Sequence, residues 1–260
     1  MSLAASASDD PCRILRQFDA EMRADPPPEP GVSRTWSGGV LRTTGRDHCV
    51  GYSALAGADL DREIATQVDF FRILGVPFEW KLYGHDRPDG LADRLARAGF
   101  RPEATEHLMV RDLQAGTIED PALDGITLQQ VRDPAGLQDF VAAGSAAFGR
   151  DESWAFAAYG GRLADPTCAL HVAYDGAQPV ATGRLELPPE RAFASLWGGG
   201  TIPSHRSRGI YRALVAARAW EALWRGYRYL TVDARDTSRP ILQRLGFVEL
   251  TPVTAWMWEP

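Results

Sequence analysis

The sequence predicts an α+β fold with two tandem domains, each a mixed, mostly antiparallel sheet flanked by helices. Segments of strand-like composition alternate with segments of helical periodicity along the 260 residues. Each half begins with an Asp-Pro pair that suits a helix start, Asp10-Pro11 and Asp133-Pro134. Each half also has a later helix that ends in Gly-Phe, Gly99-Phe100 and Gly246-Phe247. These shared features predict a repeated fold.

In the first half, an apolar stripe of Ile14, Phe18 and Met22 supports the helix that begins at Pro11. The other elements predicted here are strands near Val32–Trp36, Val40–Thr44 and Val50–Leu55, a helix at Leu60–Leu74, a strand at Pro77–Tyr83, a helix that ends before Gly99, and a strand at Glu106–Val110.

In the second half, Asp175-Gly176 predicts a hairpin turn between two strands. The predicted elements are a helix at Asp151–Ala164, strands at Cys168–Tyr174, Pro179–Leu187 and Ala192–Trp197, a helix from Ile210 to a cap at Gly226, a strand at Tyr227–Ala234, a helix at Ser238–Leu245 and an extended segment at Phe247–Trp258. Gly198-Gly199-Gly200 follow the third strand, and are either a bulge or a flexible strand end.

The repeat places the first domain at residues 1–115, a linker at 116–125 and the second domain at 126–260. The second copy is the longer one, and its extra residues include the predicted helix at Asp151–Ala164. An alternative stays open, because Gly-Phe after a helix is a common cap with a packing aromatic and the two halves could match by chance.

Composition indicates a packed protein, with 45% hydrophobic and 24% charged residues. A net charge of −6 argues against general nucleic-acid binding, and no apolar run is long enough for a membrane span. Cys12, Cys49 and Cys168 are isolated, without the paired spacing of a zinc site or a disulfide framework. We therefore expect no metal site and a cytoplasmic location. Oligomeric state is not predicted.

A turn rich in arginine lies between the strand-like run ending at Pro203 and the helix that starts at Ile210. Gly209 allows the backbone to approach an anion closely, and the helix start presents free N–H groups there. Arg206 and Arg208 add donors that suit phosphate. The turn therefore predicts a phosphate site, and the alternative is a solvated arginine-rich turn that only enters a helix.

From Gly125 to Trp258 the order of elements resembles the GNAT superfamily of N-acetyltransferases. The cofactor signature of that family is Arg/Gln-x-x-Gly-x-Gly/Ala, and here it reads Arg206-Ser207-Arg208-Gly209-Ile210-Tyr211. Only the last position departs from the signature. The second marker is a short helix closing on Gly-Phe, which appears here at Gly246-Phe247.

The resemblance implies that acetyl-CoA or another acyl-CoA is bound by the second copy. The residues that it implies for the cofactor are Gly199, Gly200, Thr201 and Ile202 along the pantetheine arm, and Arg206, Ser207, Arg208, Gly209, Ile210, Tyr211 and Arg212 around the diphosphate. The first copy reads Asp59-Leu60-Asp61 before its central helix, which is acidic and lacks the arginine–glycine pattern. It is therefore expected to be a degenerate, scaffold-like domain without a cofactor.

The implied activity is direct acyl transfer to an unidentified amine, either a small molecule or a protein amine. Many family members carry an acidic tyrosine where this chain has Leu242, and others carry a basic glutamate on the strand that here reads Phe193–Trp197. Neither is present. Glu186 on the adjacent strand is the nearest carboxylate that could act as the catalytic base, and the alternative is an exposed strand residue. A non-catalytic CoA-binding module, regulatory or structural, remains the alternative function.

Acceptor choice in this family comes from the first two helices and the loop that joins them. Asp151 and Glu152 could attract a cationic amine, and Trp154 and Phe156 could wall its pocket. The alternative is a helix start whose acidic residues complement the helix dipole.

Overall fold

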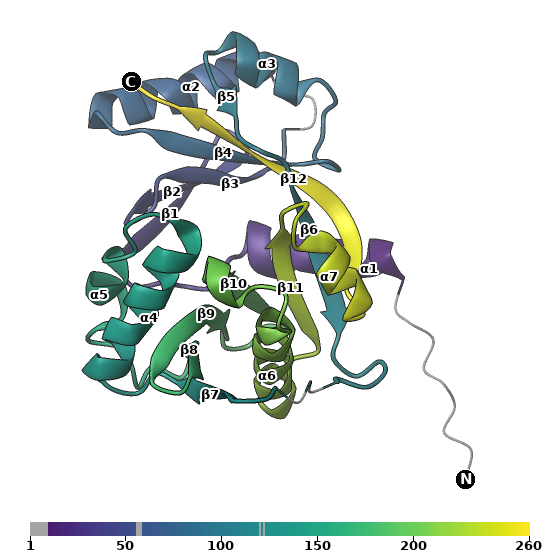
Figure 1. Cartoon of the computed structure of the whole chain (residues 1–260). Helices are drawn as coiled ribbons and strands as arrows, with labels where there is room; N and C mark the ends of the chain where they lie inside the picture. The colour runs from purple at the N-terminus through teal and green to yellow at the C-terminus, as the bar shows by residue number, and fades with distance from the viewer. Residues whose placement is uncertain (1–9, 56–58, 120, 122) are drawn as a thin grey trace. The chain divides into compact units, whose positions relative to one another are not determined.

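The computed structural model describes residues 10–55, 59–119, 121 and 123–260, which form two compact units (Figure 1). The N-terminal unit comprises Asp10–Met109, Asp233–Arg239 and Glu249–Pro260. The C-terminal unit comprises Val110–Val232 and Pro240–Val248. Each unit combines helices with a mixed, mostly antiparallel sheet, as the sequence predicts. Both units are discontinuous in sequence, whereas the predicted boundaries follow the chain without a break.

The N-terminal unit contains the strands β1-β2-β3-β4-β12, hydrogen-bonded in that order, and the short strand β5 also pairs with β12. Its elements are α1 (Pro11–Phe18) running into a π-helical turn (Asp19–Ala24), β1 (Val32–Ser37), β2 (Val40–Gly45), β3 (Cys49–Ser53), α2 (Leu60–Leu74), β4 (Phe78–Tyr83), α3 (Leu91–Arg97), β5 (Arg101–Pro102) and β12 (Val248–Trp258). The strand β6 (Glu106–Asp112) is divided between the two units after Met109.

Local sequence explains the helices of this unit. Oδ1 of Asp10 accepts a hydrogen bond from the Cys12 N–H at 3.1 Å, and Pro11 occupies the first helical turn, which confirms the predicted start of α1. Asp59 caps α2, and Gly75 ends it in the left-handed conformation with φ of 68°. Phe71, Phe78 and Trp80 are fully buried in the core between these elements.

The C-terminal strand β12 completes the sheet of the N-terminal unit. It pairs antiparallel with β4 over six residues, from Val253↔Tyr83 to Trp258↔Phe78. Trp258 is 6% exposed, and its ring centroid lies 5.8 Å from that of Phe78. The predicted second domain ran to residue 260, but the structure places Glu249–Pro260 with the first half, because these residues pair with β4 and pack into its apolar core.

The C-terminal unit has the strand order β11-β10-β9-β8-β7. Its elements are β7 (Ile126–Gln130), α4 (Pro134–Phe148), α5 (Trp154–Tyr159), β8 (Cys168–Asp175), β9 (Gln178–Glu186), β10 (Phe193–Thr201), a 3-10 turn (Pro203–His205), α6 (Ile210–Trp224), β11 (Tyr229–Ala234) and α7 (Arg239–Arg244). All neighbouring pairs are antiparallel except β10 with β11, which are parallel.

Helices cover the two faces of this sheet (Figure 1). Leu170 and Val172 of β8 pack in one apolar cluster with α4 and α5. His171, between them in sequence, points to the other face, where its Nε2 lies 3.2 Å from an oxygen of Glu221 on α6. Alternation along the strands therefore separates an α4–α5 face from an α6 face.

The helix predicted at Asp151–Ala164 is shorter in the structure, where α5 covers only Trp154–Tyr159. Asp151 stays outside because its carboxylate accepts hydrogen bonds from the N–H and hydroxyl of Ser153. Gly160 and Gly161 end the helix.

Parts of the predicted linker at 116–125 are anchored, although positions 120 and 122 lie outside the described residues. Ile118 is buried, and the Thr117 carbonyl accepts a hydrogen bond from Arg111 at 2.8 Å.

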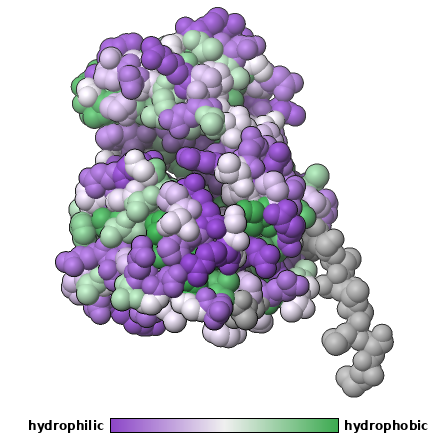
Figure 2. Space-filling model, in the orientation of Figure 1, coloured by the Kyte–Doolittle hydropathy of each residue, from purple (hydrophilic) through white to green (hydrophobic). Residues whose placement is uncertain are grey.

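None of the described helices is long and apolar enough to cross a membrane. On the face seen in Figure 2, hydrophobic residues occur in scattered groups among hydrophilic ones.

We predict that Trp258→Ala destabilises the N-terminal unit, although residue 258 is distant in sequence from most of that unit. Removing a buried indole costs about 3–5 kcal/mol. Hydrogen exchange should show lost protection in α2 and β4, with protection in α4 and β9 retained. Trp224→Ala is the matched control, because Trp224 is 80% exposed on α6. Lost protection confined to residues 126–247 would contradict the assignment of β12.

Candidate functional site

The strand β10 is interrupted by a bulge at its three glycines. Trp197 pairs with Arg184 and Gly200 pairs with Thr182, so that Gly198 and Gly199 stand opposite the single residue 183. Gly198 has a φ of 55°. A side chain at Gly199 or Gly200 would collide with a neighbouring aromatic ring, since a Cβ would lie 2.9 Å from the Tyr211 ring or 2.7 Å from the Phe148 ring. The predicted bulge is confirmed.

Beside this bulge, β10 and β11 separate. Their parallel ladder has three pairs, from Phe193↔Tyr229 to Ser195↔Thr231, whereas β10 continues to Thr201. The residues Trp197, Gly198 and Gly199 are exposed. The far half of β10 therefore presents a backbone edge that an extended ligand could pair with.

The turn that follows directs backbone donors to one place. Ser207 and Gly209 have φ of 65° and 82°, and such left-handed residues in a turn make consecutive N–H groups converge. The first backbone bond within α6 runs from the Ala213 N–H to the Gly209 carbonyl. In the described part of the chain, the N–H groups of Ile210, Tyr211 and Arg212 have no acceptor, and no side chain caps this helix. The start of α6 is thus suited to an anion.

The two signature arginines have different roles in the structure. Arg206 donates to the carbonyls of Thr201 and Ala147, each at 3.2 Å, and so helps to fix the turn. Arg208 lies 2.7 Å from an oxygen of Asp175, and His205 Nε2 lies 3.1 Å from the same oxygen. The sequence predicted Asp175 as part of the hairpin turn between β8 and β9, but not its ion pairs with Arg208 and His205.

The Asp175 carboxylate responds to these neighbours. Its hydrogen bond to Arg208 is the main cause that lowers its pKa, and His205 acts in the same direction. A lowered carboxyl pKa means that the ionised pair is present above the ordinary pKa of aspartate and is lost as pH falls through the lowered value. At neutral pH a negative charge therefore stands beside the anion-binding turn.

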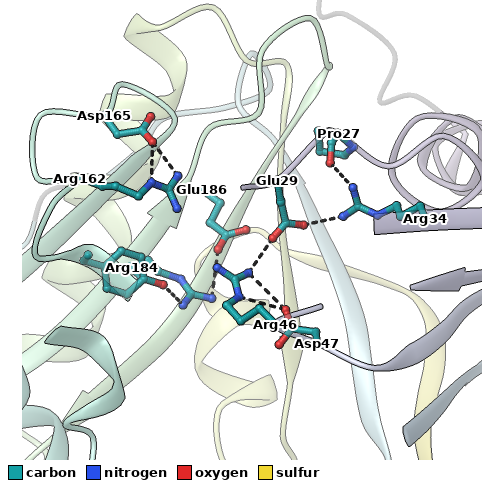
Figure 3. Close-up of polar contacts among 10 residues, drawn as sticks. Pro27, Glu29, Arg34, Arg46, Asp47, Arg162, Asp165, Arg184 and Glu186 are labelled. Atoms are coloured by element: carbon teal, nitrogen blue, oxygen red, sulfur yellow. Dashed lines mark hydrogen bonds and ion pairs between the residues drawn. The ribbon is translucent and has the colours of Figure 1, made fainter. Parts of the chain in front are cut away.

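On the α4–α5 face, Arg184 organises the strand residues nearest the bulge (Figure 3). Its guanidinium lies 3.1 Å from Glu186 and 5.5 Å from the Trp197 ring centroid, and it donates to the Tyr159 hydroxyl. Glu186 pairs across the sheet with Ser195, so the predicted base lies on the strand next to β10 and is held by an arginine. Its catalytic role stays a prediction.

Cys168 is also on this face, opposite Glu186 in the ladder. Burial raises the pKa of its thiol to about 11, so the sulfur is protonated at neutral pH.

The loop between α4 and α5 contributes a buried carboxylate. Glu152 is 6% exposed, and its two oxygens accept from Arg150 Nε at 2.6 Å and Trp154 Nε1 at 2.8 Å. Its Cγ would lie 3.5 Å from a Cβ at Gly144, a position that also faces Thr182. Thr182 donates to the Gly198 carbonyl, so Glu152 lies close to the α4–α5 side of the bulge. Asp151 instead accepts hydrogen bonds from the N–H and hydroxyl of Ser153, two residues along the chain.

Leu242, on α7, is fully buried and apolar. Tyr211 lies against Gly199, and Arg218 lies beneath both, 1% exposed. Sequence reasoning missed Arg218. The available signal was a charged residue four positions after Leu214, within the apolar stripe of an otherwise alanine-rich helix.

The N-terminal unit repeats this backbone arrangement, but side chains fill the place where its two strands separate. On β3, Tyr52 pairs with Leu41 and Val50 with Arg42, which leaves Gly51 as a bulge. The parallel ladder between β3 and β4 has two pairs.

Beyond that ladder, Arg23 lies over the rings of Tyr83 and Tyr52, with its guanidinium carbon 3.6 and 5.1 Å from their centroids. Arg23 is 4% exposed and forms ion pairs with Asp19 and Asp86 at 2.8 and 2.9 Å. The helix that follows, α2, is capped by Asp59, whose carboxylate accepts from the Arg62 N–H.

Comparison with known proteins identifies the domain. Residues 135–247 match the acetyltransferase (GNAT) family. A GCN5-related N-acetyltransferase from Kribbella flavida is 15% identical, with a TM-score of 0.70 and 96% of each chain covered. One from Sphaerobacter thermophilus is 15% identical, with a TM-score of 0.64 over 95% of this chain and 84% of the other. A tandem GNAT protein from the clavulanic acid biosynthesis pathway is 14% identical, with a TM-score of 0.66 over 99% and 97%. A sequence search among curated proteins gave no significant match.

Residues 135–247 are therefore a GNAT acetyltransferase domain, and nearly the whole chain has the fold of tandem GNAT proteins. The predicted resemblance is confirmed. Enzymes of this family take an acyl group from an acyl-CoA and transfer it to an amine. The site suits such a donor, because the uncapped N–H groups at α6 can receive a diphosphate and the open edge of β10 can pair with an extended amide chain.

We predict that Asp175→Asn tightens the binding of CoA. The change removes a negative charge that competes with phosphate for Arg208 and His205, and exposed charge interactions of this kind change affinity by up to about fivefold. Calorimetric titration at low salt should show the gain, and high salt should reduce it. Asp165→Asn is the control, since Asp165 is also paired with an arginine, Arg162, but lies in the loop before β8 (Figure 3). Weaker binding in Asp175→Asn would show that this carboxylate chiefly supports the turn.

Proposed function

We propose that the C-terminal unit transfers an acetyl group from acetyl-CoA directly to the nitrogen of an amine. The uncapped, left-handed turn at Ser207–Gly209 carries this proposal, together with the interrupted strand before it. The N–H groups of Ser207–Arg212 would hold the diphosphate. The backbone of Gly199–Ile202 would pair with the pantetheine arm.

Direct transfer agrees with the chemistry of the nearby sulfur. Cys168 is the cysteine on the α4–α5 face, and its raised pKa leaves almost no thiolate to accept an acyl group. The amine itself would therefore attack the thioester. It must first lose a proton, since an ordinary ammonium has a pKa near ~10. Glu186 is our candidate for the base, acting through water from the neighbouring strand.

For the acceptor, the α4–α5 side of the bulge favours an amine cation on an apolar body. Trp197 and Trp154 are 40% and 48% exposed, and Phe148 is 39% exposed beside Gly200. Aromatic faces attract both apolar groups and cations. The Glu152 carboxylate accepts from Trp154 Nε1 and pairs with Arg150, and its negative charge would be shared between that arginine and the amine.

The N-terminal unit is, in this proposal, a degenerate copy of the fold that binds no acyl-CoA. Arg23 occupies the place where β3 and β4 separate, and Asp59 already satisfies a donor at the start of α2. Removing Arg23 would take its ion pair from the Asp86 carboxylate, which is only 4% exposed. The chain should thus bind one acyl-CoA.

We predict that Gly209→Ala weakens acetyl-CoA binding at least about tenfold, which is ~1.4 kcal/mol. The new Cβ strains a residue with φ of 82°, lies 3.2 Å from Leu123 and disturbs the N–H groups at α6. Gly226→Ala is a matched control, because Gly226 has φ of 88° with open space around it and lies at the other end of α6. Calorimetry should give one site per chain for the wild type.

Turnover separates catalysis from binding alone. Release of free CoA thiol should be followed across a panel of amines, with Gly209→Ala as the impaired enzyme. Binding without release for every amine would favour the non-catalytic CoA-binding module. Absence of binding by the wild type at millimolar acetyl-CoA would refute both functions.

We predict that Trp197→Ala and Glu152→Gln each raise KM for an arylalkyl amine about tenfold and leave KM for acetyl-CoA within twofold. Trp224→Ala, which removes an exposed tryptophan from α6, should change neither constant. Preference of the wild type for small polar amines, with no effect of Trp197→Ala, would contradict the proposed acceptor class.

A further inference from the structure

Two departures from the family pattern concern where the chain carries a tyrosine hydroxyl. Leu242 stands where many relatives carry an acidic tyrosine, and it is a fully buried hydrocarbon that can donate no proton. Tyr211 stands where the cofactor signature has glycine or alanine. The chain therefore lacks a hydroxyl at one position and has an additional one at the other.

The hydroxyl-bearing end of Tyr211 reaches β10. Its Cε2, the ring atom next to the carbon that carries the hydroxyl, lies 2.9 Å from the place of a Cβ on Gly199, whereas Cδ2 lies 3.7 Å away. Gly199 is one of the two bulged residues beside the separated strands. Within the described residues, the Tyr211 hydroxyl has no hydrogen-bond partner, and the side chain is only partly buried.

Arg218 supports this arrangement from one side. It donates to the carbonyls of Leu214, Arg184 and Trp197 at 2.9, 3.0 and 3.4 Å. Its guanidinium carbon would lie 2.6 Å from a Cβ on Gly183, so it fits only against a glycine. No carboxylate of the described chain forms an ion pair with it. The result is a fixed, uncompensated positive charge next to the bulge and to Tyr211.

The protonation states of Tyr211 and Arg218 suit a role for Tyr211 as a proton donor. Burial raises the pKa of Tyr211, so that its O–H is intact at neutral pH, and Arg218 acts in the opposite direction by favouring the phenolate. A phenol that is protonated at rest, and whose anion has a neighbouring cation, is suited to give up its proton transiently.

We propose that Tyr211 is the general acid of the acyl transfer, positioned over Gly199 and assisted by the charge of Arg218. This rests on the proposed function. As the tetrahedral intermediate collapses, the carbon–sulfur bond breaks, its electron pair goes to sulfur, and the Tyr211 proton moves to that sulfur. The new carbon–nitrogen bond remains in the product, the amine proton goes to water, and Tyr211 regains a proton from solvent.

Tyr211→Phe tests the proposal, because it removes the hydroxyl and keeps the ring against Gly199. We expect kcat to fall about 10²-fold while the Kd for acetyl-CoA changes less than twofold. Tyr227→Phe is the matched control, since it removes a buried hydroxyl that donates to the Pro188 carbonyl at 2.9 Å elsewhere in the same unit. That variant should keep its kcat.

A second measurement needs no turnover. The pKa of the thiol of bound CoA is followed by the ultraviolet absorbance of its thiolate during a pH titration. A hydrogen bond from Tyr211 stabilises the thiolate, so the bound thiol should titrate at higher pH in Tyr211→Phe than in the wild type. Desulfo-CoA, which lacks the sulfur, should bind both proteins equally.

An unchanged kcat in Tyr211→Phe, or an unchanged titration of the bound thiol, would overturn this assignment and leave the proposed function intact. Failure of the wild type to bind CoA would instead overturn the proposed function, and the role of Tyr211 with it.

Discussion

The site depends on backbone hydrogen bonds that the fold leaves unmade. One extra residue in β10 breaks its register with β9, and its ladder with β11 stops after three pairs. A short distance along the chain, α6 begins with N–H groups that no described residue accepts from or caps. Unpaired backbone groups are costly when buried, so a protein keeps them where solvent or a ligand can satisfy them. A phosphorylated, amide-containing cofactor supplies both kinds of partner along one continuous path.

The N-terminal unit has the same backbone arrangement but fills it with its own side chains instead of a ligand. Its equivalent strands also carry a bulge and separate early, but aromatic rings and the Arg23 guanidinium occupy the place where they part. Its helix supplies its own cap from Asp59. One backbone plan can thus serve as a ligand site or as a packed core, and a few side chains decide between the two.

Local signals in the sequence were sufficient to predict most elements. Asp10-Pro11 and Asp133-Pro134 start helices as expected, α2 has its predicted bounds, and the glycines of β10 form the predicted bulge. These features depend on neighbouring residues, which a sequence displays directly. The contacts of Arg206 and Asp175 depend on segments that are distant in sequence, and no local pattern specifies them. The same holds for β12, since its alternation marks a strand but not the strand that it joins.

The membership of β12 bears on how the protein is made. During synthesis the first half emerges early, yet its sheet lacks β12 beside β4, and its core lacks Trp258, until residues 249–260 have been translated. Until then, the first half has an exposed β4 edge and exposed apolar surface. Chaperones would be most needed in this state. A premature stop codon just before Glu249 would therefore harm the portion translated first.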